Sequence, residues 1–226
     1  MGKLIKMDLN SNEWDEHWSR RFIMLNGFFN FYRKYVMSNA LSHYIEKYFP
    51  KNGTFVECGS GSSLTSHLIK KYKRKLVALD ISKKALEEAE ANGKMDKFVH
   101  ADITKKLPFG NESIDGIWNL GVMEHFSKKE IDKTMKEFHR TLKKGAYVIM
   151  FIPPVYSFTG MAYRTVENII KLTTGKSFRF YPDEPSRLKS KKDGIDMVRR
   201  NGFDDCRVYF PWRNCFGDLV VIARKP

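Results

Sequence analysis

Cysteine and long apolar segments are both scarce in this sequence. The three cysteines, Cys58, Cys206 and Cys215, are an odd number at unrelated spacings, so they form neither a disulfide framework nor a paired metal-binding motif. This pattern favours a reducing compartment, and we expect a cytoplasmic protein. The longest uninterrupted apolar run, at 146–152, is far shorter than the ~18 residues of a membrane-spanning helix. We therefore expect no transmembrane segment.

Other features are absent as well. The first residues contain no apolar segment of the kind that a secretory signal needs, and the chain shows no internal repeat or low-complexity linker. Histidine and cysteine do not cluster at the spacings of metal sites, so we expect no bound metal. The 226 residues are 42% hydrophobic and 29% charged, which is typical of a globular protein with one α/β domain and an addition.

Acidic residues are too few to balance the basic ones. The chain has 40 Lys and Arg residues against 26 Asp and Glu, which gives a net charge of +14. A nucleic acid, an anionic membrane surface or an anionic substrate could each be the partner of such a chain, and charge alone does not choose among them. The basic residues are scattered in short runs, for example at 70–75, 128–129 and 199–200, which is typical of a solvated surface.

Short apolar runs alternate with helical patterns from residue 53 onward, which predicts a parallel sheet with helical crossovers. We expect strands at 54–58, 75–80, 97–100, 113–119 and 146–152. Helices are expected at 62–72 and 128–143, the second with Gly145 just beyond its end. The runs at 207–210 and 218–223 are too close together for a crossover helix, so they should form an antiparallel hairpin.

Two segments lie outside this pattern. Aromatic residues recur at mostly helical spacing within 11–50, so we expect residues 1–50 to form an N-terminal helical lid and residues 51–226 to form the main domain. Aromatics at such spacing are also typical of a buried core. Residues 153–192 are long for a connection between a strand and a helix, and we expect them to form a cap over the substrate.

A glycine-rich loop follows the first expected strand, in the sequence FVECGSGSS at 55–63. Gly59 and Gly61 allow a tight turn and let a ligand lie close to the backbone. Asp80 comes 19 positions after Gly61, at the end of the next strand, where its carboxylate can accept the hydroxyls of a ribose. Asp102 follows the third strand and could accept a hydrogen bond from an adenine amine.

The charge of the ligand separates two kinds of cofactor. A dinucleotide-binding loop has a third glycine where this chain has Leu64, and Glu57 would repel the phosphates of a dinucleotide. S-adenosylmethionine (SAM) has no phosphate and carries an ammonium and a sulfonium, so Glu57 favours it. Ile81 and Ile103 could then pack on the two faces of its adenine.

Four stretches match the motifs of a known family in order and spacing: ECGSGSS, ALDIS, HADITKKLPFGNESIDGIWNLGVMEHF and LKKGAYVIMFIPP. They resemble the class I SAM-dependent methyltransferases, and most closely the small-molecule methyltransferases that carry a D…LPF…EH stretch. The resemblance covers about 53–154 and extends to the tail through the expected hairpin. Ser63 stands where the family often has a third glycine.

The resemblance implies a fold and an activity. The fold would be a Rossmann-like α/β fold, with a mostly parallel seven-stranded sheet, a C-terminal antiparallel hairpin and helices on both faces. The reaction would be methyl transfer from SAM to a small or medium acceptor, leaving S-adenosylhomocysteine. The N-terminal stretch also resembles methyltransferases of polysaccharide and glycolipid assembly, so a sugar, a glycolipid or another metabolite is the expected acceptor.

The cofactor residues follow from the glycine loop and from the family's motifs. The loop and Glu57 would surround the methionine part, and the backbone carbonyls at the end of the fourth strand would meet its ammonium. The residues expected to contact SAM are Glu57, Gly59, Ser60, Gly61, Asp80, Ile81, Asp102, Ile103, Asn119 and Leu120.

The acceptor side is marked by His125, which follows the fourth strand beside the expected methyl position. An oxygen nucleophile needs a general base, and His125 is the candidate. The other interpretation is that Glu124 and His125 shape the loop and pack against the cofactor. Trp14 and Trp18 lie one helical turn apart and could both face the substrate. The cap would add Tyr156, Tyr163 and Arg164.

Three other functions compete with this one. An RNA methyltransferase would suit the charge, but the motif of base-amine enzymes is missing after the fourth strand, where the chain reads NLGVMEH, and no cysteine follows a proline. A non-catalytic SAM-binding protein would keep the same cofactor residues. A peripheral enzyme acting on a lipid-linked acceptor would use the basic charge and the aromatic helices against an anionic membrane.

Overall fold

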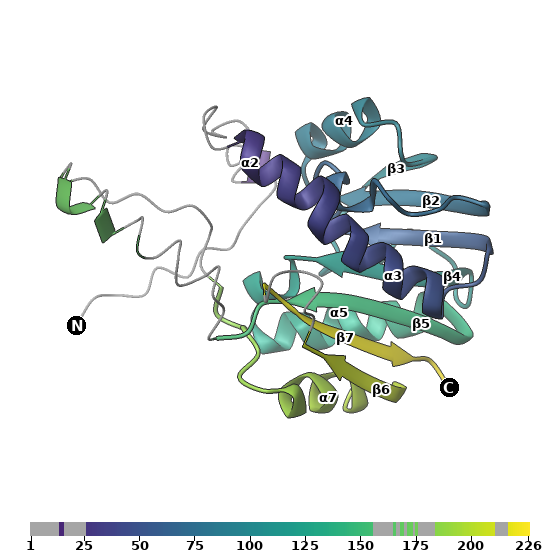
Figure 1. Cartoon of the computed structure of the whole chain (residues 1–226). Helices are drawn as coiled ribbons and strands as arrows, with labels where there is room; N and C mark the ends of the chain where they lie inside the picture. The colour runs from purple at the N-terminus through teal and green to yellow at the C-terminus, as the bar shows by residue number, and fades with distance from the viewer. Residues whose placement is uncertain are drawn as a thin grey trace.

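A seven-stranded sheet organises the part of the chain that the computed structural model describes, namely residues 14–15, 26–155, 165, 168–169, 171–173, 175, 184–210 and 217–226. Its strand order is β3-β2-β1-β4-β5-β7-β6 (Figure 1). The strands are β1 Asn52–Cys58, β2 Lys73–Asp80, β3 Lys97–His100, β4 Ile114–Leu120, β5 Leu142–Ile152, β6 Asp204–Tyr209 and β7 Leu219–Arg224.

Strand direction divides the sheet into two parts. β1 pairs in parallel with β2 and β4, β3 pairs in parallel with β2, and β5 pairs in parallel with β4. β7 runs antiparallel to both β5 and β6. The predicted fold class is therefore confirmed, including the C-terminal antiparallel hairpin.

Helices cover both faces of the sheet. On one face lie α2 (Asn26–Phe31), the π-helical turn η1 (Tyr32–Met37), α3 (Ser38–Tyr48) and α4 (Lys83–Ala91), and on the other lie α5 (Lys128–Thr141) and α7 (Lys191–Arg199). Figure 1 shows α3 crossing the sheet on one side with α5 behind it. The two faces therefore have separate apolar cores.

The longest apolar run of the sequence lies in β5, an interior strand of the sheet. Val148, Met150 and Ile152 are buried in the core with α5, and Ile149 and Phe151 are buried in the core with α3. A strand that is covered on both faces needs apolar side chains at successive positions rather than at alternating ones.

The expected helix at 62–72 is wrong. The structure has a single 3-10 turn there, η2 (Leu64–Ser66), preceded by Ser63 in the left-handed conformation with φ 53°. The backbone of Leu68, just after this turn, forms hydrogen bonds with two serine side chains of α3. The Leu68 amide donates to Ser38 Oγ at 2.7 Å, and Ser42 Oγ donates to the Leu68 carbonyl at 3.1 Å.

The end of the second expected helix is also corrected. α5 ends at Thr141 and β5 begins at Leu142, whose side chain is fully buried and which pairs with Ile114 of β4. Gly145 therefore lies inside the strand rather than beyond a helix. Its amide donates to the Lys225 carbonyl at 2.9 Å, so β5 pairs with the last residues of the chain.

The expected boundary at residue 50 falls between α3 and β1, and Arg74 of β2 spans it. Its guanidinium is 1% exposed and pairs with Glu46 of α3 at 2.5 Å. It also donates to the carbonyls of Pro50, Lys70 and Phe49 at 2.8, 3.0 and 3.1 Å. α3 is thus tied to the sheet by a buried charge as well as by its apolar face.

We predict that Arg74→Met lowers the free energy of unfolding by about 3 kcal/mol, because removing one partner of a buried ion pair leaves the other groups unsatisfied. Urea unfolding followed by circular dichroism measures this change. Arg224→Met is the matched control, since Arg224 and Asp204 form an ion pair with both side chains over 40% exposed. An equal loss of stability in both variants would contradict a special role for Arg74.

Candidate functional site

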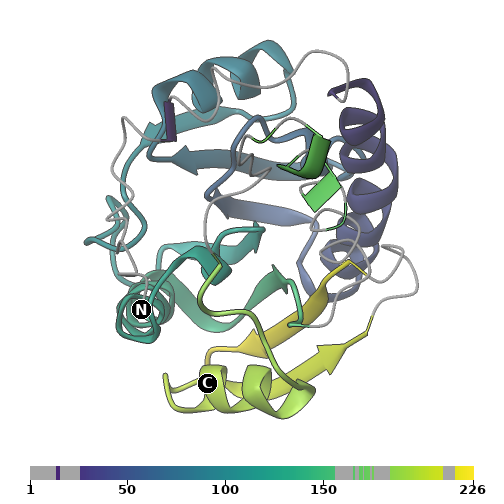
Figure 2. The same ribbon diagram turned by 90° about the vertical axis from the view of Figure 1, so that its left-hand side faces the viewer.

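The parallel strands end at one edge of the sheet, and the loops beyond them carry the predicted cofactor residues. Figure 2 looks onto this edge. Glu57 lies near the end of β1, Asp80 ends β2, and Leu120 ends β4. Asp102 follows β3 by two residues. The topology therefore gathers at one edge side chains that are far apart in the sequence.

The glycine loop folds over the end of β2. The amides of Gly59 and Ser60 both donate to the Leu79 carbonyl, at 2.8 and 3.1 Å. Gly59 and Gly61 have φ values of 70° and 50°, the region that favours glycine. Gly59 also lies against the loop after β4, because a Cβ on this residue would stand 2.5 Å from Val122 Cγ2. The β1 and β4 loops are therefore in contact.

Glu57 is a buried carboxyl group with one oxygen that lacks a hydrogen-bond partner among the described residues. It is 2% exposed, and the Thr65 hydroxyl donates to its Oε1 at 3.3 Å. Its Oε2 has no hydrogen-bond partner in the part of the chain that is described. Burial raises the pKa of Glu57 to about 7, with the nearby hydroxyls and the Trp118 indole opposing the shift. A bound cation would stabilise the ionised form.

Asp80 links the glycine loop to the start of α4. Its Oδ2 accepts from the Gly61 amide at 2.8 Å, and its Oδ1 accepts from the Ser82 amide at 2.9 Å. Burial raises the pKa of Asp80, while these amide bonds oppose the shift. A carboxylate has about four acceptor positions, so Asp80 retains acceptor capacity for a ribose hydroxyl.

The predicted adenine residues differ in accessibility. Asp102 Oδ1 accepts from the Thr104 amide and hydroxyl at 2.8 and 2.7 Å, and no hydrogen bond to Oδ2 is formed within the described residues. Ile81 is partly exposed, whereas Ile103 is 5% exposed and packs in the core beside α5. Asp102 and Ile81 are thus the more accessible of these residues.

The end of β4 contains two further predicted residues. Asn119 is fully buried, and neither its amide nitrogen nor its amide oxygen has a hydrogen-bond partner among the described residues. Leu120 is partly buried against the core beside α3. The strand end is fixed by the Gly121 amide, which donates to the Phe151 carbonyl at 3.2 Å.

Two predicted residues of the acceptor side are brought together. His125 lies in the 3-10 turn η3 (Met123–His125), and its ring meets the Trp14 ring edge-on, with centroids 5.4 Å apart. Asp15 lies close by, accepting a hydrogen bond from the Ser82 hydroxyl at 2.5 Å. The other predicted substrate residues lie outside the described residues: Trp18, Tyr156, Tyr163 and Arg164.

Sequence reasoning missed a group of charged side chains beyond β4. One ligand atom from each of Glu124, His125 and Glu184 lies within 4.8 Å of the others. Burial and, to a lesser extent, neighbouring carboxyl groups raise the pKa of both Glu124 and Asp218. Arg187, which forms an ion pair with Glu184, opposes this shift. No motif identified Glu184, Arg187 or Asp218, because they come from segments far from Glu124 in the sequence.

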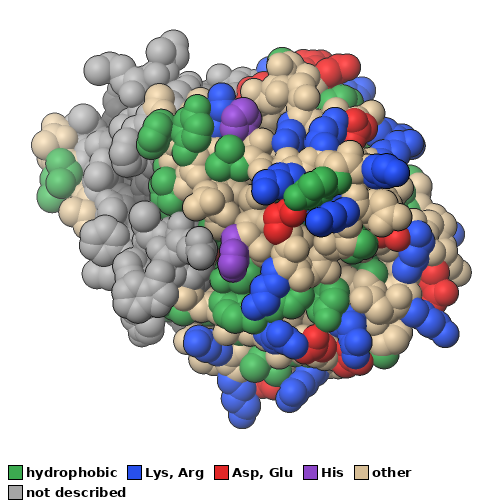
Figure 3. All heavy atoms as spheres, turned by 45° about the vertical axis from the view of Figure 1, so that its right-hand side comes forward, with side chains coloured by type: hydrophobic (Ala, Val, Ile, Leu, Met, Phe, Trp, Pro, Cys, Tyr) green, Lys and Arg blue, Asp and Glu red, His purple; other side chains and the backbone are tan. Residues whose placement is uncertain are grey.

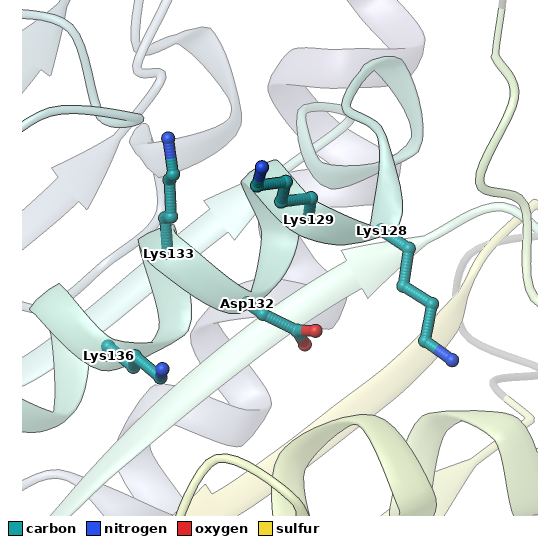
Figure 4. Close-up of a pocket in the computed structure, with 5 residues that line it drawn as sticks. All are labelled: Lys128, Lys129, Asp132, Lys133 and Lys136. Atoms are coloured by element: carbon teal, nitrogen blue, oxygen red, sulfur yellow. The ribbon is translucent and has the colours of Figure 1, made fainter.

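The basic residues are spread over the surface. Figure 3 shows Lys and Arg side chains distributed over one face of the molecule, with acidic side chains between them. On the exposed side of α5, a hollow is lined by Lys128, Lys129, Asp132, Lys133 and Lys136 (Figure 4). Asp132 there accepts from Arg200 Nε at 2.7 Å. Among the described residues, every helix falls short of the length and apolarity needed to cross a membrane.

We predict that Gly59→Ala lowers the free energy of unfolding by about 2 kcal/mol or more, from its left-handed φ and its collision with Val122. Gly93→Ala is the control, because its φ is 64° but a Cβ there would meet nothing within 4 Å. Thermal unfolding compares the two variants. Adding Val122→Ala to Gly59→Ala should restore part of the loss, and no restoration would exclude the collision as its cause.

Comparisons with known proteins agree with this geometry. The family model described as a methyltransferase domain matches residues 56–150. No curated protein gives a significant match. The solved structures include a SAM-dependent methyltransferase from Thermotoga maritima, named as a possible histamine N-methyltransferase. It is 21% identical, covers 94% of this chain and 99% of its own, and has a TM-score of 0.64.

Two more structures extend the comparison. A protein from Methanococcus maripaludis, named as a putative SAM-dependent methyltransferase, is 16% identical over 97% of each chain, with a TM-score of 0.65. Phosphoethanolamine N-methyltransferase 2 from Haemonchus contortus, in complex with phosphomonomethylethanolamine and S-adenosylhomocysteine, is 13% identical over 94% of this chain and 60% of its own, with a TM-score of 0.61. At these identities the structures establish the fold.

The matched domain contains the glycine loop and the strands β2 to β4, and the complete sheet has the order and the antiparallel hairpin expected from the family. The predicted family, the enzyme class and the cofactor SAM are confirmed. Residues 56–150 therefore match a methyltransferase domain, within a chain that has the fold of the class I SAM-dependent methyltransferases.

Proposed function

We propose that this methyltransferase acts on a small or medium acceptor, such as a sugar, a glycolipid or another metabolite. The observation that carries the proposal is the contact between Gly59 and Val122, which sets the cofactor loop directly beside the loop that bears His125. A cofactor held by the first loop would present its methyl group toward the second. The Trp14 ring beside His125 would form one wall of the acceptor pocket.

The buried carboxyl groups support the proposed mode of SAM binding. Glu57, with its unpartnered Oε2, would face the cationic methionine part, and Asp80 would accept the ribose hydroxyls. Asp102 would accept the adenine amine through Oδ2. When bound, SAM supplies a methyl group already activated by its sulfonium. The protein then has to align the acceptor about 3–3.5 Å from that methyl group and exclude water.

Several structural neighbours support a small acceptor. The names of two of them specify small amines, histamine and phosphoethanolamine, and a third is human N-acetylserotonin methyltransferase, with a TM-score of 0.55. An RNA acceptor is the second candidate because of the net charge of +14. The scattered basic residues in Figure 3 favour the small acceptor over a phosphate track.

The proposal is tested by two measurements on the full chain. Calorimetry should detect SAM and S-adenosylhomocysteine binding, and a coupled assay should detect S-adenosylhomocysteine release with a metabolite panel that includes sugars, glycolipids and amines. Filter binding of RNA at two salt concentrations provides the comparison. Tight, steeply salt-dependent RNA binding together with RNA methylation would overturn the proposal in favour of an RNA methyltransferase.

We predict that His125→Ala reduces kcat by about 100-fold or more for a hydroxyl acceptor, because it removes the candidate general base. SAM affinity should stay within about twofold, since His125 lies in the turn after β4 (Met123–His125) and not in the glycine-rich loop after β1. Steady-state kinetics and calorimetry give both values. An unchanged kcat would leave His125 with the structural role of supporting Trp14.

We predict that SAM binds more tightly as the pH rises from 6 to 7.5. The protonated Glu57 carboxyl, with its pKa raised to about 7, offers no charge to the ammonium and sulfonium, whereas the ionised form does. The expected gain is about tenfold or less, because one proton is released on binding. Glu57→Gln should bind SAM more weakly and with a flat pH profile over this range. Exposed Glu90→Gln is the control, and an unchanged pH profile in Glu57→Gln would refute this role.

A further inference from the structure

Beyond β4 and β5, residues from separate segments form a group that we name the edge cluster: Glu124, His125, Glu184, Arg187 and Asp218. Backbone hydrogen bonds fix these segments together. The Ser186 amide donates to the Glu124 carbonyl at 3.1 Å, and the Val155 amide, just past β5, donates to the Leu188 carbonyl at 2.9 Å. These backbone hydrogen bonds therefore hold Glu124 and the 184–188 segment in fixed relative positions.

The edge cluster adjoins the contact between the loops that follow β1 and β4. A Cβ on Gly121, the residue after β4, would stand 3.6 Å from Glu124 Oε1. Val122, the next residue, contacts Gly59 of the cofactor loop. The Glu124 carboxyl group is thus two residues away from the loop contact that brings cofactor and acceptor together, and His125 with Trp14 adjoins it.

The edge cluster contains more carboxyl groups than cations. It has three carboxyl groups and one guanidinium, which is paired with Glu184, and burial raises the pKa of both Glu124 and Asp218. Glu124 is 3% exposed, and its Oε2 has no hydrogen-bond partner among the described residues. A buried carboxyl group in that state is costly unless a donor or a cation satisfies it. The open position on Glu124 therefore points to a ligand that brings N–H donors or positive charge.

A nitrogen cation fits this position better than a divalent metal. Glu184, which would be a metal ligand, already binds the Arg187 guanidinium, and that positive charge would repel a metal ion. An ammonium group needs only acceptors at hydrogen-bond distance, which Glu124 supplies. Nη1 of Arg187 is buried without a partner among the described residues, so it can donate to an oxygen atom of the same acceptor.

We propose that the edge cluster binds the amine nitrogen of the methyl acceptor, so that the enzyme is an N-methyltransferase of small organic amines. This inference rests on the proposed function, and it narrows the acceptor from small metabolites in general to amines. Where the acceptor also carries a hydroxyl or another oxygen group, Arg187 can bind that group, and the body of the acceptor can lie against Trp14.

The ammonium group of the acceptor gives one proton to the Glu124 carboxylate and becomes a neutral amine. The amine lone pair forms the new nitrogen–carbon bond to the methyl group as the carbon–sulfur bond breaks, and the electron pair of that bond stays on sulfur. The products are a methylammonium and S-adenosylhomocysteine, and the proton on Glu124 leaves to solvent.

The test uses matched pairs of probes in which a hydroxyl replaces the amine: benzylamine and benzyl alcohol, tyramine and 4-(2-hydroxyethyl)phenol, ethanolamine and ethylene glycol. Binding is measured by calorimetry with the full chain saturated in S-adenosylhomocysteine, and turnover by S-adenosylhomocysteine release from SAM. We expect at least one amine to bind at least tenfold more tightly than its hydroxyl counterpart and to be methylated.

Variants then locate the binding site. Glu124→Gln should lower kcat/KM for that amine by at least 100-fold while SAM affinity stays within twofold. Asp218→Asn is the second variant in case Glu124→Gln does not fold, and it should lower kcat/KM at least tenfold. Exposed Glu90→Gln is the matched control and should leave kcat/KM unchanged.

Three outcomes would overturn the inference while leaving the proposed function intact. The first is that none of the amines binds better than its hydroxyl counterpart. The second is that a folded, SAM-binding Glu124→Gln variant keeps full activity on amines. The third is that Mg²⁺ or Mn²⁺ is required and a chelator abolishes activity, which would make the edge cluster a metal site. Failure of the wild type to bind SAM would instead refute the proposed function itself.

Discussion

The approach of Gly59 to Val122 is the contact on which the site depends. Two loops that follow different strands can touch there only because the first has no side chain and adopts a positive φ. The contact fixes the distance between the glycine-rich loop, which we propose surrounds the cofactor, and the loop that carries Glu124 and His125. Methyl transfer requires such fixed spacing, because its rate depends on the alignment of the acceptor with the methyl group.

Much of this architecture could be predicted from the sequence. The strands near Glu57, Asp80 and Asn119 are short apolar runs that end in polar residues, and a parallel sheet then brings those residues to one edge. The C-terminal hairpin followed from the short connection between two apolar runs. These predictions combine local sequence patterns with one rule of topology, namely that parallel strands end at the same edge of a sheet. The structure contains both the predicted strands and the predicted hairpin.

What could not be predicted depends on contacts between distant segments. The helix expected at 62–72 is replaced by a short turn, after which Leu68 bonds to Ser38 and Ser42 of α3, and nothing in the local sequence specifies those partners. Gly145 looked like a helix end but pairs with Lys225 at the far end of the chain. Glu184 and Asp218 belong to no recognisable sequence motif. They join the edge cluster only because the fold brings their segments close to Glu124 beyond β4.

The short turn after β1 has a thermodynamic consequence. Thr65 within it bonds to Glu57, and Ser66 accepts the Trp118 indole N–H at 3.2 Å, while α3 holds the following Leu68. The segment that follows the glycine-rich loop is therefore held by α3 and not by a helix of its own. Under the proposed mode of SAM binding, cofactor binding and the docking of α3 onto the sheet are linked equilibria, so a ligand that orders the loop also protects α3 against local unfolding.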